Sequence, residues 1–280
     1  MKLLCAGEAF EDLIFVGLDR IPGPGEEVKT DTFEATVGGG AVITAVAAAR
    51  LGMRVDLLSA LGPAAVKRLR QERVRVTNLI RPGEKHAITA AISTTDDRAF
   101  VTFNGVNARL EGRLARAMPK AKADHIHLCF YPHDCGLWTR IITRLRKRGI
   151  TTSWDFGWNE PLSGDRGLID LIDALDFVFV NELEARLYTG EATLEAALTD
   201  WRQRKAIVIV KQGESGATWL APDRDIHFPA PRVNVVDTTG AGDSFNAGFL
   251  VAWMKGKSPV ACLTAGNKIG AQSTQRAGGI

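Results

Sequence analysis

Short apolar runs alternate with amphipathic stretches along most of the chain, and this rhythm limits the possible folds more than any other feature. Strands joined through helices run parallel, and helices cover both faces of a parallel sheet. The sequence therefore predicts a mostly parallel α/β sheet that binds ligands beyond the carboxyl ends of its strands. The expected strands are Lys2–Ala6, Val55–Ser59, His125–Phe130, Thr151–Asp155, Phe177–Val180 and Ile207–Lys211. The expected helices are Val42–Leu51, Ala65–Glu72, Leu137–Arg148, Leu168–Ala174, Glu182–Leu187, Leu194–Gln203, Phe245–Met254 and Pro259–Arg276.

Two β-rich stretches, about residues 13–37 and 86–106, interrupt this rhythm. Both carry Thr, Val, Ile and Phe with period-two patterning and turn residues, which is typical of strands. We expect them to pair into one small sheet. Because no linker separates domains, residues 1–280 are predicted to form a single α/β domain with this small sheet attached.

Composition excludes several classes of protein. The net charge of +3 is small and the Lys and Arg residues are dispersed, so no nucleic-acid partner is expected. No apolar run reaches membrane-spanning length, so no membrane association is expected either. The four cysteines form no CxxC pair, which favours a reducing, cytoplasmic location over a disulfide framework.

A glycine turn before a predicted helix carries the strongest chemical signal. Gly240 and Gly242 permit close approach to the backbone, and the unpaired N–H groups at the start of the next helix suit an anion. Asp243 stands at the same helix start. An anion site beside a carboxylate suits removal of a hydroxyl proton as a phosphoryl group arrives. Alternatively, the stretch is a turn followed by a helix whose first acid complements its dipole.

The longer string Asp237-Thr238-Thr239-Gly240-Ala241-Gly242-Asp243 resembles the C-terminal signature of the ribokinase-like (PfkB) carbohydrate kinases. The resemblance implies a ribokinase-like fold and ATP-dependent phosphorylation of a hydroxymethyl group on a carbohydrate, as in ribokinase, fructokinase or 2-keto-3-deoxygluconate kinase. Asp243 would be the base, and the N–H groups of Gly240, Ala241 and Gly242 would stabilise the transferred phosphoryl group. The small sheet would be a lid, through which some relatives form homodimers. No Walker sequence is present, so P-loop chemistry is not expected.

The resemblance also implies a substrate site. Asp12 matches an Asp that holds sugar hydroxyls, and Gly38 and Gly39 match a glycine pair that the sugar approaches. Ile43 stands where the family has a sugar-binding Asn, and its apolar side chain cannot make those hydrogen bonds. Phe130, at a strand end, is a candidate lining residue. Asp155 is either a pocket residue or a turn former at the end of its strand.

Nucleotide and metal ligands follow from the same resemblance. Asn181 and Glu184 would organise Mg²⁺ through water, although Asn before a helix is also an ordinary N-cap. Lys211 and Gly213 would contact the nucleotide, although that segment also reads as a hairpin turn. The remaining candidates are Asn267 beside adenine, Gly278 in the closing loop, and Asp237 and Thr239 as ligands of a potassium ion.

Other interpretations stay open at this level. The lost Asn at Ile43 and a short loop before Pro63 suit a catalytically weak regulatory relative, although Asp243 and Glu184 argue against one. A nucleoside kinase would share the fold and the chemistry. A phosphofructokinase-type enzyme would need cations near the pocket, and none is placed there by the sequence. His125, His127 and Cys129 share a strand face and could ligate a metal, but a covered strand face holds such residues without one.

Overall fold

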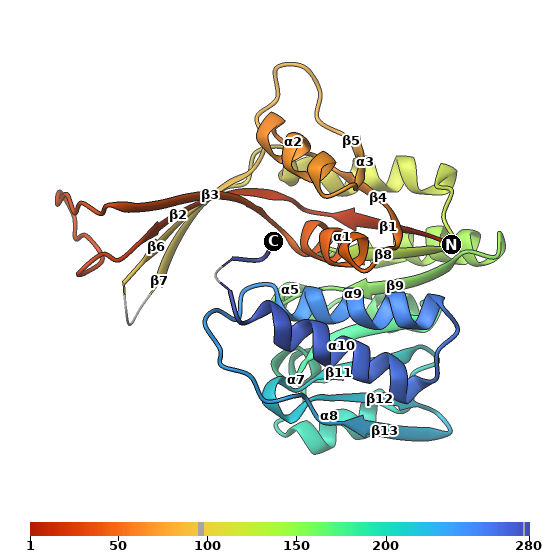
Figure 1. Ribbon diagram of the computed structural model, residues 1–280. Coiled ribbons are helices and arrows are strands. Elements are labelled where there is room, and N and C mark those ends of the chain that lie inside the picture. Colours follow the sequence, from red (N-terminus) through yellow and green to blue (C-terminus); the bar gives the residue numbers. More distant parts are fainter. Residues whose placement is uncertain (95–97, 277) are drawn as a thin grey trace.

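The computed structural model describes residues 1–94, 98–276 and 278–280 and contains a nine-stranded sheet (Figure 1). The strand order is β13-β12-β11-β10-β9-β8-β1-β4-β5, and the pairs from β11 through to β5 are parallel. β12 and β13 are antiparallel, so the sheet is mostly parallel, as predicted. The strands are β1 (Lys2–Gly7), β4 (Arg54–Ser59), β5 (Arg75–Asn78), β8 (His125–Cys129), β9 (Thr151–Asp155), β10 (Phe177–Asn181), β11 (Ile207–Lys211), β12 (Ala217–Ala221) and β13 (Arg224–Phe228).

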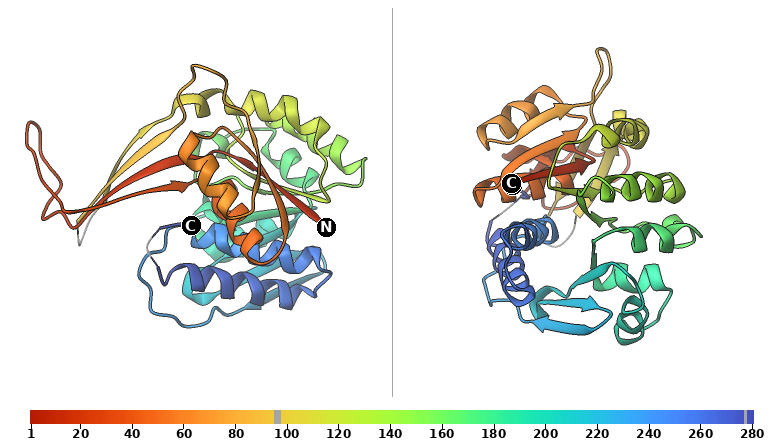
Figure 2. Two further views of the ribbon diagram at one scale, coloured as in Figure 1. Left: turned by 45° about the horizontal axis from the view of Figure 1, so that its top comes forward. Right: turned by 90° about the vertical axis from the view of Figure 1, so that its right-hand side faces the viewer.

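Helices cover both faces of this sheet (Figures 1 and 2). On one face lie α1 (Gly40–Arg50), α2 (Pro63–Gln71), α9 (Ala241–Met254) and α10 (Pro259–Ser273). On the other lie α3 (Leu110–Ala117), α4 (Cys135–Arg146), α6 (Leu168–Ala174), α7 (Glu182–Thr189) and α8 (Leu194–Trp201), with the short α5 (Glu160–Ser163) beside α7. Three short 3₁₀ turns, Gly105–Arg109, Met118–Lys120 and Gly213–Ser215, complete the elements.

The core on the α4 side is built around aromatic rings. Trp154 of β9 is fully buried, and its ring centroid lies 4.9 Å from that of Phe130, 5.1 Å from that of Trp138 and 5.1 Å from that of Phe156. Its indole Nε1 donates to the Phe130 carbonyl at 2.7 Å. This satisfied donor lets a large polar-edged ring fill the middle of the core.

The two β-rich segments pair into a second sheet, as predicted, and it projects to one side of the molecule (Figure 1). This small sheet has the order β3-β2-β6-β7, with β2 and β6 parallel and the outer pairs antiparallel. It begins at Phe10 rather than at residue 13, so Asp12 belongs to it. Its strands are β2 (Phe10–Val16), β3 (Thr32–Gly38), β6 (Ile88–Ser93) and β7 (Arg98–Phe103).

Several predicted boundaries were wrong. α9 begins at Ala241 rather than Phe245, and α1 at Gly40 rather than Val42, because small residues are helical there without any apolar periodicity. α10 ends at Ser273 rather than Arg276. β5 and α3 were not predicted; most residues of β5 are exposed at the sheet edge, so it has no buried apolar run.

No helix within residues 1–94, 98–276 and 278–280 is long and apolar enough to cross a membrane.

Candidate active site

The carboxyl ends of the parallel strands bring the predicted residues to one edge of the large sheet. Asp155, Asn181 and Lys211 are the last residues of three consecutive strands, β9, β10 and β11. The start of α9 reaches the same place, since Asn246 in its second turn donates to Asp155. The polar groups therefore gather where parallel sheets bind ligands.

The turn before α9 has the conformation that the sequence indicates. Gly240 is left-handed with φ 72°, and a Cβ there would stand 2.9 Å from Ile43 Cδ1, so both conformation and space require glycine. No side chain caps α9. The Ala241 N–H donates to the Thr238 carbonyl at 3.1 Å, and the next N–H groups of this first turn can face an anion with the positive end of the helix dipole behind them.

Asp243 lies in this first turn of α9 and faces α1. A Cβ on Gly40 would stand 2.8 Å from Asp243 Oδ1, so the glycine makes room for the carboxylate. Thr44 Oγ1 donates to the Asp243 carbonyl at 3.1 Å. Burial and the neighbouring Asp155 raise the pKa of Asp243 to about 7, against the opposing charge of Lys211. A carboxylate with this pKa is matched to proton transfer near neutral pH.

Asp155 makes polar contacts with two other elements besides its own turn. Its Oδ2 accepts from Lys211 Nζ at 2.7 Å and from Asn246 Nδ2 at 2.7 Å. Although burial opposes ionisation, Lys211 and these hydrogen bonds hold the pKa of Asp155 below its usual value. Asn246 was missed by the sequence analysis; the available signal was its position one helical turn after Asp243.

Asn181 and Glu184 form a reciprocal capping box at the start of α7. Asn181 Oδ1 accepts from the Glu184 N–H at 2.8 Å, and Glu184 Oε2 accepts from the Asn181 N–H at 2.9 Å. Burial, then Asp155, raises the pKa of Glu184. The ordinary N-cap is therefore present, and the carboxylate also adds to the negative charge around Asp155.

The proposed sugar-binding residues meet at the base of the small sheet. Asp12 and Gly38 lie on adjacent strands, where the Asp12 carboxylate occupies the space that a Cβ on Gly38 would need. Gly39 has φ 102°, and a Cβ on it would stand 3.0 Å from Ala9 Cα. Burial raises the pKa of Asp12 to about 6.

Three candidate residues have structural roles instead. Ile43 is buried beneath the glycine turn, near Gly240 and Gly279, where an apolar side chain fills space. Phe130 packs on Trp154 within the core, so its ring is not part of the polar site. The side-chain amide of Asn267 donates to the carbonyls of Phe228 and Pro229 at 2.8 and 3.2 Å, which ties α10 to the strand β13 end.

The segment around Asp237 joins the glycine turn to the C-terminal loop. Asp237 Oδ1 accepts from the N–H and the hydroxyl of Thr239 at 2.9 and 2.7 Å, and Oδ2 accepts from the Gly278 N–H at 3.0 Å. Gly213 is left-handed and opens the predicted turn between β11 and β12. Asp237, Thr239 and Gly278 are thus brought together, whereas Gly213 lies on a separate loop.

The two histidines of β8 are hydrogen-bonded, although His127 Nε2 has no partner among the described residues. His125 Nε2 and His127 Nδ1 both contact Ser153 Oγ, at 2.8 and 2.7 Å, and His125 Nδ1 contacts Thr151 Oγ1 at 2.9 Å. Burial lowers the pKa of His127 to about 4, so its imidazole is neutral. Within the described ranges no cluster of three His, Cys, Asp or Glu side chains is placed to hold a metal ion.

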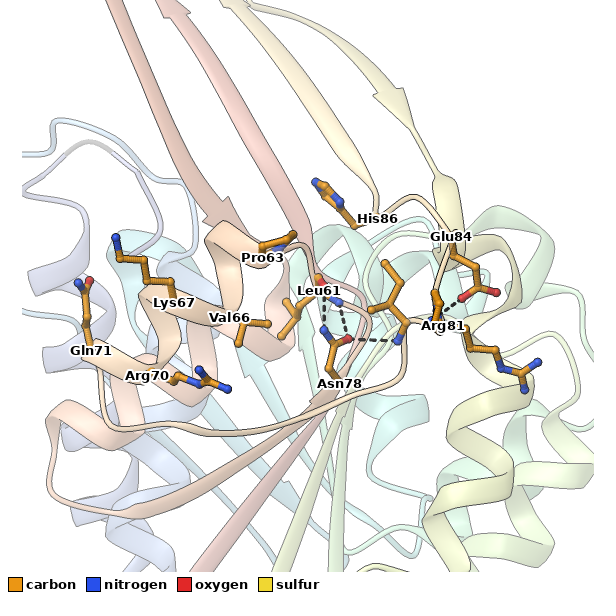
Figure 3. Close-up of a pocket in the computed structure, with 12 residues that line it drawn as sticks. Leu61, Pro63, Val66, Lys67, Arg70, Gln71, Asn78, Arg81, Glu84 and His86 are labelled. Carbon is orange, nitrogen blue, oxygen red and sulfur yellow. Dashed lines mark hydrogen bonds between the residues drawn. The ribbon is translucent and has the colours of Figure 1, made fainter.

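A cavity of about 870 Å³ lies elsewhere, between α2 and the loop after β5. Figure 3 shows Lys67 and Arg70 of α2 on one side and Arg81 of the loop on the other. None of the predicted site residues lines it. This cavity and the site around Asp155 and Asp243 are therefore different places.

Comparison with known proteins agrees with this geometry. The model of the pfkB family carbohydrate kinases matches residues 1–280. A nucleoside kinase of Methanocaldococcus jannaschii is 26% identical over 91% of this chain and 84% of its own length, and a ribokinase of Bacillus subtilis is 27% identical over 96% and 91%. The structure of Arabidopsis thaliana ribokinase complexed with ribose and ATP superposes with a TM-score of 0.79 at 24% identity, covering 99% of this chain and 93% of that one, which confirms the ribokinase-like fold. The chain belongs to the pfkB family of carbohydrate kinases.

Proposed function

We propose that this kinase transfers the γ-phosphoryl group of ATP to a hydroxymethyl group of a sugar, with Asp243 as the base. The observation that carries the proposal is the position of the Asp243 carboxylate in the first turn of α9, whose N–H groups no side chain caps. The carboxylate takes the hydroxyl proton while the N–H groups of the glycine turn stabilise charge on the transferred group. ATP is the ligand of the related ribokinase structure.

In this proposal, residues of the small sheet and of the turn that follows it bind the acceptor. Asp12 accepts hydrogen bonds from acceptor hydroxyls, and Gly38 and Gly39 allow the sugar to approach the backbone. Ile43 packs under Gly240 and makes no polar contact with the acceptor, so this chain lacks one set of hydrogen bonds usual for its family. The substrate is therefore not fixed by the family alone.

The acidic cluster fits a hydrated divalent cation. The negative charge of Asp155 raises the pKa of Glu184, and a nearby cation would offset that charge. Hard cations such as Mg²⁺ prefer carboxylate oxygens and retain water. When bound, Mg²⁺ neutralises charge on the nucleotide phosphates. Glu184 and Asn181 would hold its waters. Asp237, Thr239 and the loop of Gly278 are the proposed potassium site, supported by their mutual hydrogen bonds.

Acceptor-dependent ADP release tests the proposal. MgATP is offered with pentoses, hexoses, their phosphates, 2-keto-3-deoxy acids and nucleosides, with and without K⁺. We expect turnover with one class of sugar. Turnover with nucleosides alone would replace the sugar by a nucleoside as acceptor, and binding of nucleotide without turnover on any compound would contradict the kinase assignment.

The rate should depend on pH through Asp243. Because its pKa is raised to about 7, the base is protonated below that value and ionised above it. We expect kcat/KM to fall about tenfold per pH unit below pH 7 and to level off above it. The Asp12→Asn variant, which lacks another carboxyl group of raised pKa, should keep the same midpoint. A profile that stays flat down to pH 5 would be inconsistent with Asp243 as the base.

The small sheet also offers a surface for a second copy of the chain. The strand register places ten apolar side chains on the face opposite Asp12: Leu13, Phe15, Phe33, Ala35, Ile88, Ala90, Ile92, Ala99, Val101 and Phe103. Phe33 and Val101 are 56% and 68% exposed. We propose that two copies pack these faces together in the cytoplasm, since an apolar face matches its own copy about a twofold axis. Glu11 shares this face at its base, where its carboxylate is hydrogen-bonded to His86.

Charge on this face should break the dimer. Phe33→Glu is expected to halve the mass measured by light scattering, because two carboxylates would be buried against apolar surface. Phe100→Glu is the control: Phe100 is similarly exposed but lies on the other face of the same sheet, and this variant should keep the dimer mass. A wild-type protein that is monomeric at all concentrations would refute the dimer.

A further inference from the structure

Lys211 is paired with Asp155 beside the glycine turn. Its Nζ donates to Asp155 Oδ2 at 2.7 Å, and the two side chains are only 13% and 11% exposed. A Cβ on Gly242 would stand 3.1 Å from Nζ, and Cε and Cδ follow at 3.7 and 3.8 Å. The ammonium group therefore lies between the end of β9 and the first turn of α9, directly against the backbone next to Asp243.

Asn246 fixes the other side of this ion pair. Its Nδ2 donates to the same Asp155 oxygen at 2.7 Å, and its side chain is fully buried in α9. Asp155 is thus held by one group from β11 and one from α9. The pair has a defined geometry because two groups converge on one Asp155 oxygen, whereas Asn246 Oδ1 has no partner among the described residues.

The charged and titratable groups around Asp243 come from five elements. Asp155 of β9 and Glu184 of α7 are negative, Lys211 of β11 is positive, and the neutral thiols Cys5 of β1 and Cys129 of β8 lie beneath. From α1, which packs on the other side, Gly40 and Thr44 contribute no charge. Lys211 is the one cation among these neighbours in the described part of the chain, and it faces three carboxylates.

We propose that Lys211 is a positioning residue: its ammonium group, fixed by Asp155, is the internal counter-ion that keeps Asp243 able to accept a proton, and it is not a ligand of the nucleotide phosphates. The inference rests on the proposed role of Asp243 as base. It replaces the expectation that Lys211 contacts a phosphate, because the ammonium group is already paired with Asp155 and lies beside Gly242.

The proposal predicts a change in acidity rather than in nucleotide affinity. Without Lys211, Asp155 and Glu184 act unopposed on Asp243, so its proton should be held more tightly. An opposite charge within a few ångströms shifts a pKa by about 1–3 units. Lys211→Met should therefore move the acid limb of kcat/KM upward by at least about one pH unit, which lowers kcat/KM at pH 7 by about fivefold or more, with the KM for ATP changed by less than threefold.

Removing Asp155 as well supplies the decisive comparison. Asp155 raises the pKa of Asp243 and Lys211 lowers it, so the double variant Asp155→Asn/Lys211→Met should have its midpoint close to that of the wild type. If Lys211 instead bound a nucleotide phosphate, both variants would raise the KM for ATP by the same factor and leave the midpoint of the pH profile unchanged. That result would overturn the proposal.

A second measurement keeps the test independent of folding and of turnover. The carboxyl carbon of Asp243 is titrated by ¹³C NMR in free protein without nucleotide or divalent cation, assigned by its absence in Asp243→Asn. If Lys211→Met does not fold, the pair Asp155→Asn and Asp155→Asn/Lys211→Met gives the same comparison. An upward shift of about one pH unit or more on losing Lys211 supports the proposal, and an unchanged midpoint refutes it. Absence of kinase activity in the wild type would refute the proposed function alone, because this titration would still report on Lys211.

Discussion

Asp243→Asn is expected to lower kcat by about 10²- to 10⁴-fold, the usual contribution of a positioned general base. The amide has the shape of the carboxylate but cannot take the hydroxyl proton. Nucleotide binding should persist because the N–H groups of the glycine turn are unchanged. The measurements are steady-state ADP release and the dissociation constant for ATP, made side by side.

The same substitution should stabilise the protein at alkaline pH. The pKa of Asp243 is raised in the folded state, so its contribution to stability is complete at low pH and is lost as the pH rises through about 7. At pH 8 the Asn variant has no buried carboxylate to ionise, so it should melt at a higher temperature than the wild type. Asp223→Asn, in the exposed turn between β12 and β13, removes the same charge and should change neither rate nor melting temperature. Turnover that survives in Asp243→Asn would show that another group is the base.

Trp154→Ala should reduce the free energy of unfolding by about 3–5 kcal/mol, the range for large aromatic residues in cores. Its ring is fully buried among Phe130, Trp138 and Phe156, so truncation leaves a cavity that rigid neighbours cannot close. The loss also leaves the Phe130 carbonyl without its indole donor. Chemical denaturation followed by circular dichroism measures the change.

A matched control lies four residues along the chain. Trp158 is 54% exposed, so Trp158→Ala should change the free energy of unfolding by no more than about 0.5 kcal/mol. Equal losses in the two variants would mean that burial at Trp154 is not what stabilises this half of the protein.

The layered fold was predictable because strand and helix periodicity differ over long runs. The six predicted strands all occur, as do the two segments that form the small sheet. The errors fall where periodicity carries no information: β5 is an exposed edge strand, and the first turns of α1 and α9 consist of small residues. Such elements are fixed by tertiary contacts, which no local pattern records.

The candidate site was predictable as a set of residues but not as a set of contacts. The glycine turn and Asp243 are encoded in one continuous motif, and Asp155, Asn181 and Lys211 are recognisable as strand ends. That Lys211 pairs with Asp155 depends on strand order, since the two are separated by β10. The contacts of Ile43 with Gly279 and of Asn267 with Phe228 could not be predicted, because these partners lie far away in sequence.

Asp12 and Asp243 belong to two different bodies of the fold. Asp12 is on β2, bonded into the small sheet between β3 and β6, whereas Asp243 is on α9 against the large sheet (Figure 1). In the proposed enzyme Asp12, which binds the acceptor, and Asp243, which deprotonates it, thus belong to separate parts of the fold. Any tilt of the small sheet would carry the sugar out of reach of the base. The reaction would therefore proceed only while the small sheet lies against the large one. When the two separate, no base would be in place to activate water for attack on the nucleotide.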